Sequence, residues 1–196
     1  GASQLDSGLN QLTENNASLN AGAEQVFTTL LDSAYSTVTS KGITIESLTI
    51  ANYKTVLTSI VADPTDTQKA ELITIADATL NAKLAEIRVN NNSIDPRYYD
   101  AVKYMIAVQM KQNPQMTFDQ AVAYVASNMQ EVGQYVSAAA DRDGQLAIKG
   151  LCLELAKAAV KPEIDTAVAK LDSYNEFYKG IGDYTDGVTA AAAGAN

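Results

Sequence analysis

The acidic turn Asp141-Arg142-Asp143-Gly144 is the part of the sequence that comes nearest to a metal-binding motif. In a calcium-binding EF-hand loop, carboxylate ligands precede a glycine at the sixth position and a glutamate ends the loop at the twelfth. With Gly144 placed sixth, Ala139 stands first and Gly150 twelfth, so carboxylates are missing at both of these positions. We therefore expect an ordinary acidic turn and no metal site.

The sequence offers few groups for catalysis. The chain contains no histidine and a single cysteine, Cys152, which stands in the apolar run Leu151–Leu153. Without a histidine to lower its pKa, this thiol is expected to be buried and structural rather than a nucleophile. Neighbouring carboxylates such as Asp141 and Asp143 receive no acid or base role, because such roles depend on separation in space. We predict no catalytic, cofactor-binding or metal-binding residue and interpret the protein as a non-enzyme.

Length and charge narrow the classes of fold and partner. The 196 residues are 46% hydrophobic and 19% charged, which is typical of a folded globular chain. A net charge of −9 repels phosphate backbones, so we expect no nucleic-acid partner. No stretch approaches the ~18 consecutive apolar residues that cross a bilayer. The chain starts at Gly1, without methionine and within a repeat, so we expect a piece of a longer protein whose membrane anchor lies elsewhere.

Two terminal segments carry the clearest structural pattern. In both, residues recur in alternating steps of four and three, as in a helix that packs along a partner helix. The predicted stalk-packing residues are Leu5, Leu9, Leu12, Asn16, Leu19 and Val26 in the first segment and Tyr174, Phe177, Ile181, Tyr184 and Val188 in the second. Asn16 on this seam either fixes the register of pairing or is solvated near a frayed end.

Glycines follow the same seven-residue spacing. They stand at Gly1, Gly8 and Gly22 in the first segment and at Gly180, Gly187 and Gly194 in the second. A glycine inside a helix costs about 1 kcal/mol relative to alanine, so a regular series needs a reason. We interpret the series as a device for close packing of the two stalk helices. The alternative is a flexible helix with incidental glycines.

The middle of the chain predicts further helices separated by turns, with no sustained two-residue alternation that would indicate a sheet. Thr65 is a predicted N-cap, Asp95 is another, and Thr117 opens a capping box. Pro162 is predicted to begin the final helix. Each of these signals places a helix boundary.

Together these patterns predict an all-α fold of about seven helices. A helical domain is inserted into an antiparallel two-helix coiled-coil stalk. The expected parts are an N-terminal stalk helix over 1–39, an inserted domain over 40–161 and a C-terminal stalk helix over 162–196.

Tyrosine is abundant, with ten residues and no tryptophan. Tyrosine is frequent on surfaces that are both apolar and hydrogen-bonding. Tyr98 is therefore a candidate for a partner-binding surface, although an aromatic that simply fills a helix contact would look the same in sequence.

Parts of both terminal segments resemble a known family. Residues 1–12 and 19–23 are similar to the X-X-X-Leu-X-X-Gly heptads of YhgE/Pip (phage infection protein) family surface proteins, and residues 171–180 and 184–188 to the segment where that family returns to its repeats. The helix around Leu48–Leu57 is also similar.

The resemblance implies a bacterial membrane protein with transmembrane segments beyond each end of this chain. It implies a helical ectodomain on the extracellular side of the plasma membrane that some phages use for adsorption, and relatives that are accessory to type VII secretion. The expected function is a non-enzymatic spacer or interaction module with a protein partner, an envelope component or a phage protein. The alternative is a sensor that relays ligand binding through the stalk helices.

Overall fold

The computed structural model describes residues 2–89 and 92–195, and these residues form an all-α fold as predicted. Seven α-helices occur in this described part of the chain. They are α1 (Ala2–Thr39), α2 (Tyr53–Ala62), α3 (Asp66–Glu86), α4 (Tyr99–Gln112), α5 (Phe118–Ser127), α6 (Val136–Ala140) and α7 (Arg142–Ala195). Two 3-10 segments, η1 (Pro96–Tyr98) and η2 (Met129–Tyr135), and a two-residue ladder of β1 (Arg88–Val89) with β2 (Asn92–Ser93) complete the elements.

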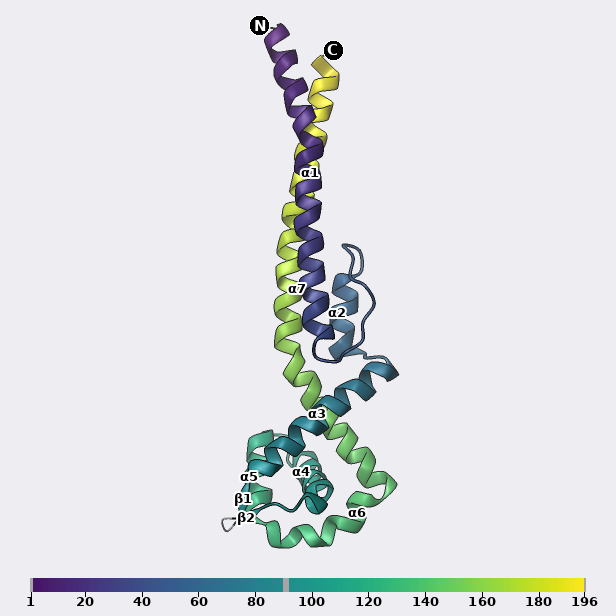
Figure 1. Ribbon diagram of the computed structural model, residues 1–196, viewed down its shortest axis with the longest axis vertical. Helices are drawn as coiled ribbons and strands as arrows, with labels where there is room; N and C mark the ends of the chain where they lie inside the picture. The colour runs from purple at the N-terminus through teal and green to yellow at the C-terminus, as the bar shows by residue number, and fades with distance from the viewer. Residues whose placement is uncertain (1, 90–91, 196) are drawn as a thin grey trace. The chain divides into compact units, whose positions relative to one another are not determined.

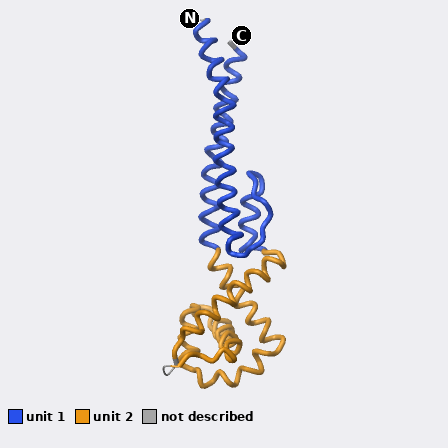
Figure 2. Tube along the Cα trace, viewed as in Figure 1, with its two compact units in different colours: residues 1–63, 161–196 blue, residues 64–160 orange. Residues whose placement is uncertain are grey.

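The chain forms two compact units (Figure 2). Unit 1 contains residues 1–63 and 161–196, and unit 2 contains residues 64–160. Residues 40–63 were predicted to belong to the inserted domain. The structure places them in unit 1, since α2 packs against α1 and α7 there.

In unit 1, α1 and α7 lie side by side and run in opposite directions (Figure 1). Asn16 Nδ2 donates a hydrogen bond to the Thr185 carbonyl at 2.9 Å, and the Tyr174 hydroxyl donates one to the Ala23 carbonyl at 3.0 Å. Lys41 pairs with Glu163 at 3.0 Å near the opposite end of the helix pair. The antiparallel pairing of the terminal segments is therefore confirmed.

One of the two predicted columns in each helix is displaced by one residue from the observed contact line. Buried positions include Phe27 where Val26 was predicted and Thr185 where Tyr184 was predicted. Leu5, Leu12, Leu19, Val26, Phe177 and Tyr184 are exposed, so their assignment to stalk packing is wrong. Asn16 is buried in the seam and Tyr174 bonds across it, whereas Leu9, Ile181 and Val188 are half-buried.

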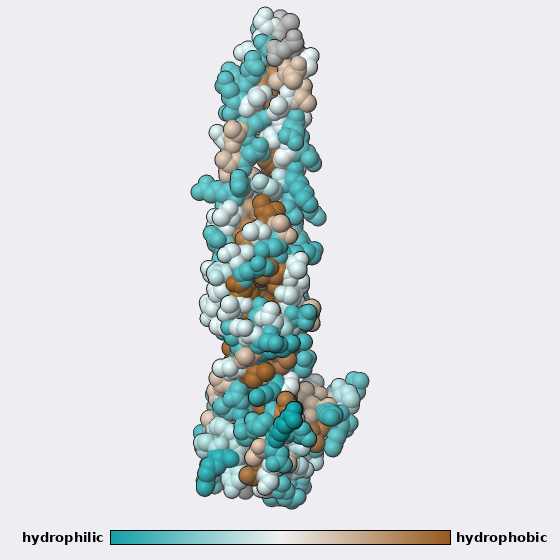
Figure 3. Space-filling model, turned by 90° about the vertical axis from the view of Figure 1, so that its right-hand side faces the viewer, coloured by the Kyte–Doolittle hydropathy of each residue, from teal (hydrophilic) through white to brown (hydrophobic). Residues whose placement is uncertain are grey.

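The packing of aromatic rings and the hydrogen bonding of buried polar groups explain why α1 and α7 pair through these columns. The Phe27 ring lies 5.3 Å from that of Tyr174, 5.6 Å from that of Tyr178 and 6.2 Å from that of Tyr53. The same register lets Thr185 receive hydrogen bonds from Asn16 and Asn20, which buried polar groups require. Figure 3 shows hydrophobic residues in a line along unit 1 between hydrophilic ones.

The predicted helix caps are found in unit 2. Thr65 and Thr117 each form a capping box, with Gln68 and Gln120 respectively. The Asp95 side chain accepts a hydrogen bond from the backbone of Arg97, but it opens η1 rather than an α-helix directly. Leu72, Ile106 and Val125 are fully or almost fully buried in the core of this unit.

Pro162 does not begin a helix. It lies inside α7, which runs without a break from Arg142 to Ala195. A proline removes one backbone hydrogen bond from a helix interior, and the apolar residues on both sides of it offset this cost by packing. Val160 and Ile164 are both buried on this helix.

Candidate functional site

An exposed apolar column runs along α1 on the outside of the α1–α7 pair. Leu5, Leu12, Leu19 and Val26 follow one another in steps of seven and are between 41% and 62% exposed. Residues seven apart lie on the same face of a helix that packs along a partner. Large apolar side chains gathered on a surface in this way are typical of an interaction site.

A second column lies on α7 and flanks the same side of the pair. Phe177 and Tyr184 are 55% and 52% exposed and also stand seven residues apart. A groove between the helices is lined by Ser33, one step beyond Val26, and by Lys170, one step before Phe177. An adjoining groove is lined by Leu30, Tyr174 and Phe177. The two columns therefore border one face.

This face carries no charge over residues 4–29 and 173–194. The face comprises three adjacent columns on each helix, and the residues of a column stand seven apart. The columns on α1 hold Gln, Leu, Gly, Asn, Ser, Val and Thr, and those on α7 hold Ser, Tyr, Phe, Gly, Ile, Val and Ala. The charged residues in these ranges all occupy other columns and are Asp6, Glu14, Glu24, Glu176, Lys179, Asp183 and Asp186. We call the surface bordered by Leu5, Leu12, Leu19, Val26, Phe177 and Tyr184 the uncharged face.

The opposite side of the pair is covered by α2 at its lower end. The Tyr53 hydroxyl donates a hydrogen bond to Asp172 at 2.6 Å, and Lys54 pairs with the same carboxylate at 2.8 Å. Leu31 and Val38 of α1 are buried there. Burial, followed by the hydrogen bond to Asp172 and its charge, raises the pKa of Tyr53 to about 12. The Lys54 bond, and then the Tyr53 bond, lower the pKa of Asp172.

Titration of Tyr53 gives a test of this contact. Because the pKa of Tyr53 rises from 10.0 to about 12 on folding, its contribution to stability should be full below pH 10 and lost as the pH rises towards 12. The ultraviolet titration of the wild type minus that of Tyr53→Phe should show this late ionisation. Asp172→Asn should move it towards lower pH, and an unchanged midpoint in that variant would contradict the contact.

The glycine series does not bring α1 and α7 together. Apart from the nearby backbone of its own helix, a β-carbon added at Gly8, Gly22, Gly180, Gly187 or Gly194 would meet no atom of the described chain within 4 Å. The interpretation that these glycines allow close packing of the two helices on each other is therefore wrong, because their positions face outward. Gly1 lies outside the described residues.

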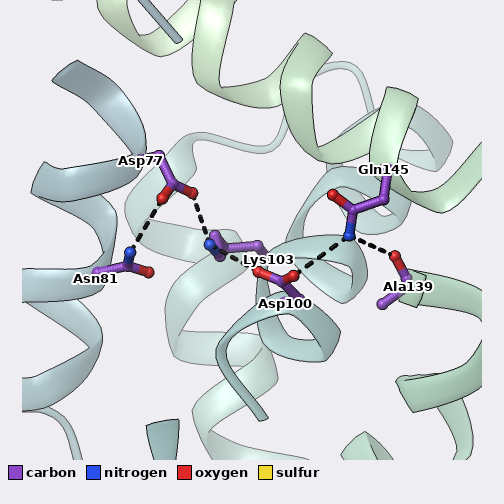
Figure 4. Close-up of polar contacts among 6 residues, drawn as sticks. All are labelled: Asp77, Asn81, Asp100, Lys103, Ala139 and Gln145. Atoms are coloured by element: carbon purple, nitrogen blue, oxygen red, sulfur yellow. Dashed lines mark hydrogen bonds and ion pairs between the residues drawn. The ribbon is translucent and has the colours of Figure 1, made fainter. Parts of the chain in front are cut away.

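Unit 2 contains a buried cation held by two carboxylates (Figure 4). Lys103 is buried on α4, and its Nζ lies 2.6 Å from Asp77 of α3 and 2.9 Å from Asp100. Asn81 donates a hydrogen bond to Asp77, and Gln145 donates one to Asp100 at 3.2 Å. The network ties α3, α4 and α7 together within this unit.

Lys103 and Asp100 each stabilise the charged form of the other. Burial lowers the pKa of Lys103, but the hydrogen bonds and charges of Asp77 and Asp100 outweigh it and the pKa ends above its usual value. The hydrogen bond from Lys103 holds the pKa of Asp100 below its usual value, against the effect of burial. Groups that stay charged and paired in this way stabilise structure and make poor general acids or bases.

Cys152 is buried on α7, as expected. Burial, followed by the charge of Asp77, raises the pKa of its thiol to about 11. The thiol is therefore protonated at neutral pH, and its predicted structural role agrees with this environment.

Unit 2 also has an apolar pocket of about 180 Å³. Leu80, Phe118, Ala156 and Val160 contribute to its lining, and Lys83 stands over the Phe118 ring with its Nζ 5.2 Å from the centroid. Within the described ranges, no three cysteine or acidic side chains come close enough to hold a metal ion. The pocket offers apolar contact and one cation.

The chain was compared with known proteins. No family model, curated protein or solved structure matches it. Among the helices of the described chain, none combines the length and apolar character that a bilayer span requires. The description of the candidate site therefore rests on the geometry of this chain alone.

Tyr98 lies in unit 2. Its ring is 39% exposed, and it borders a shallow pocket with Met129 and Gly133. Its role in partner binding stays a prediction. The Lys103 network was missed by sequence reasoning, and its one sequence signal is the spacing of Asp100 and Lys103, three residues apart on one helix face.

Proposed function

We propose that this chain is a non-enzymatic helical spacer and interaction module of a bacterial surface protein. Unit 1 serves as the spacer, and its exposed apolar face serves as the contact surface for a protein. The resemblance to the YhgE/Pip heptads supports the assignment to the extracellular side of the plasma membrane, with the membrane reached through flanking segments.

The observation that carries the proposal is the antiparallel pairing of two long helices. α1 has 38 residues, Asn16 and Ala23 bond to α7 at successive levels along it, and Lys41, just beyond its end, pairs with Glu163 of α7. At 1.5 Å per residue, α1 extends for about 57 Å. Helix pairing with polar, aromatic and ionic contacts along this length favours a stiff element over a flexible linker.

Stiffness is testable by pulsed electron paramagnetic resonance. Spin labels at Ser7→Cys and Thr28→Cys, both exposed on α1, should give one narrow distance near 32 Å, from ~1.5 Å per residue. Excess unlabelled protein removes any distances between copies, and the buried Cys152 provides no label site. A broad distribution under native conditions would overturn the spacer assignment.

The surface location needs a separate test. Protease treatment of intact source cells should release peptides from this chain while cytoplasmic marker proteins stay whole. If its peptides appear only after lysis, the extracellular assignment is wrong.

A sensor is the second candidate function, and the pocket of unit 2 favours it. Ala156 and Val160 of α7 line this pocket, and the same helix pairs with α1 in unit 1. A bound ligand would therefore contact the helix that forms the spacer. Native mass spectrometry of the chain isolated from source cells should show a co-purifying small molecule if this candidate holds.

A further inference from the structure

We propose that the uncharged face binds the same face of a second copy of this chain. The two α1–α7 pairs would then form an isologous dimer with four helices in contact. The inference rests on the proposed function, because it names the protein partner of the contact surface.

Charge placement is the first reason to choose a second copy. Unit 1 is acidic, with Asp6, Glu14 and Glu24 on α1 and no basic residue on that helix. Two acidic proteins repel unless their charges point away from the contact. Over residues 4–29 and 173–194 every charged residue occupies a column outside the face, so a like-charged copy meets no like charge along that length. A cationic partner would find no carboxylate to pair with on this surface.

The two apolar columns are also level with each other, as self-pairing requires. Asn20 donates a hydrogen bond to Thr185 at 3.1 Å, so the neighbouring residues Leu19 and Tyr184 stand at one height. One heptad along, Val26 and Phe177 correspond in the same way, because the helices are antiparallel. The levels of Leu19 and Val26 thus each present an aliphatic and an aromatic side chain, and Leu12 stands level with Ala191. A twofold axis places such a surface on an identical one without leaving either side chain unmatched.

The size of the face suits a dimer. Leu5 to Val26 spans roughly 30 Å of helix, and two adjacent helices are roughly 20 Å wide. Each copy would therefore bury about 600 Å², or about 1,200 Å² in total, which is at the lower end of stable interfaces. The outward glycines at Gly8 and Gly22 leave open space beside the leucines, so an incoming helix meets no side chain there.

Sedimentation velocity of the full chain between about 1 and 100 μM tests the inference. The wild type should sediment as a dimer at the upper concentrations. Leu12→Glu with Leu19→Glu places two charges on the face of each copy and should raise the dimer dissociation constant at least about 100-fold. Leu12→Gln with Leu19→Gln, which adds no charge, should raise it about 10-fold.

The matched control is Ala21→Glu with Thr28→Glu. It adds the same charge at the same spacing to exposed positions of α1 in the column of Glu14, away from the face. Its dissociation constant should stay within about threefold of the wild type, and circular dichroism should show every variant folded. A monomeric wild type at 100 μM, or equal effects of the two glutamate pairs, would overturn the inference.

This outcome is separable from that of the proposed function. A monomer with a narrow spin-label distance would reject self-pairing and keep the spacer. A dimer with a broad distance would keep self-pairing and reject the spacer.

Discussion

Phe27→Ala is expected to lower the free energy of unfolding of unit 1 by about 3–5 kcal/mol. Phe27 is fully buried and its ring meets those of Tyr53, Tyr174 and Tyr178. Removing the ring leaves a cavity where three elements of unit 1 meet, so α2 should lose its contact with α1. Urea unfolding followed by circular dichroism measures the loss.

Tyr35→Ala is the matched control for this change. Tyr35 lies two helical turns further along α1 and is 36% exposed. Because its ring is only partly covered, its removal should cost less than about 1 kcal/mol. Similar losses in the two variants would show that the aromatic cluster around Phe27 does not organise the unit.

Asp77→Ala combined with Asp100→Ala is expected to destabilise unit 2 by about 3–5 kcal/mol. The double change leaves the Lys103 ammonium buried without a counter-charge. Lys103→Met removes the charge but fills similar space, so it should cost much less. Calorimetry of the three proteins gives the comparison, and a larger loss in Lys103→Met than in the double variant would contradict the arrangement.

The pH dependence of these proteins should differ in sign. In the wild type the folded pKa of Lys103 lies above its usual 10.5, so this contribution to stability is full below pH 10.5 and lost as the pH rises through the folded value. In the double variant, burial without carboxylates should push this pKa below 10.5. The variant should then gain stability as rising pH neutralises the amine, until the pH reaches 10.5.

Much of the secondary structure follows from local signals in the sequence. Thr65 and Thr117 cap helices because their hydroxyls and the glutamines three residues later satisfy free backbone groups, which is a local effect. Pro162 was predicted to begin a helix but lies inside α7, because a proline signals a helix start only where packing on either side does not carry the helix through. Tertiary contacts therefore outweigh the local helix-start signal of this proline.

The register of the α1–α7 pair could not be read from apolar spacing alone. Leu12 and Leu19 are more apolar than Thr13 and Asn20, so the pattern favoured the wrong column. Hydrogen bonds from Asn16 and Asn20 to Thr185, together with the ring cluster around Phe27, select the neighbouring column instead. These contacts join residues more than 140 positions apart in the chain. The leucines expected inside therefore define the candidate site outside.

The antiparallel course of α1 and α7 has a consequence for engineering. The first turn of α1 and the last turn of α7 lie at the same end of unit 1 (Figure 1). A segment whose two ends are neighbours can be grafted into a surface loop of a host protein without forcing that loop apart. The paired ends of α1 and α7 therefore suit this chain for insertion into such a loop.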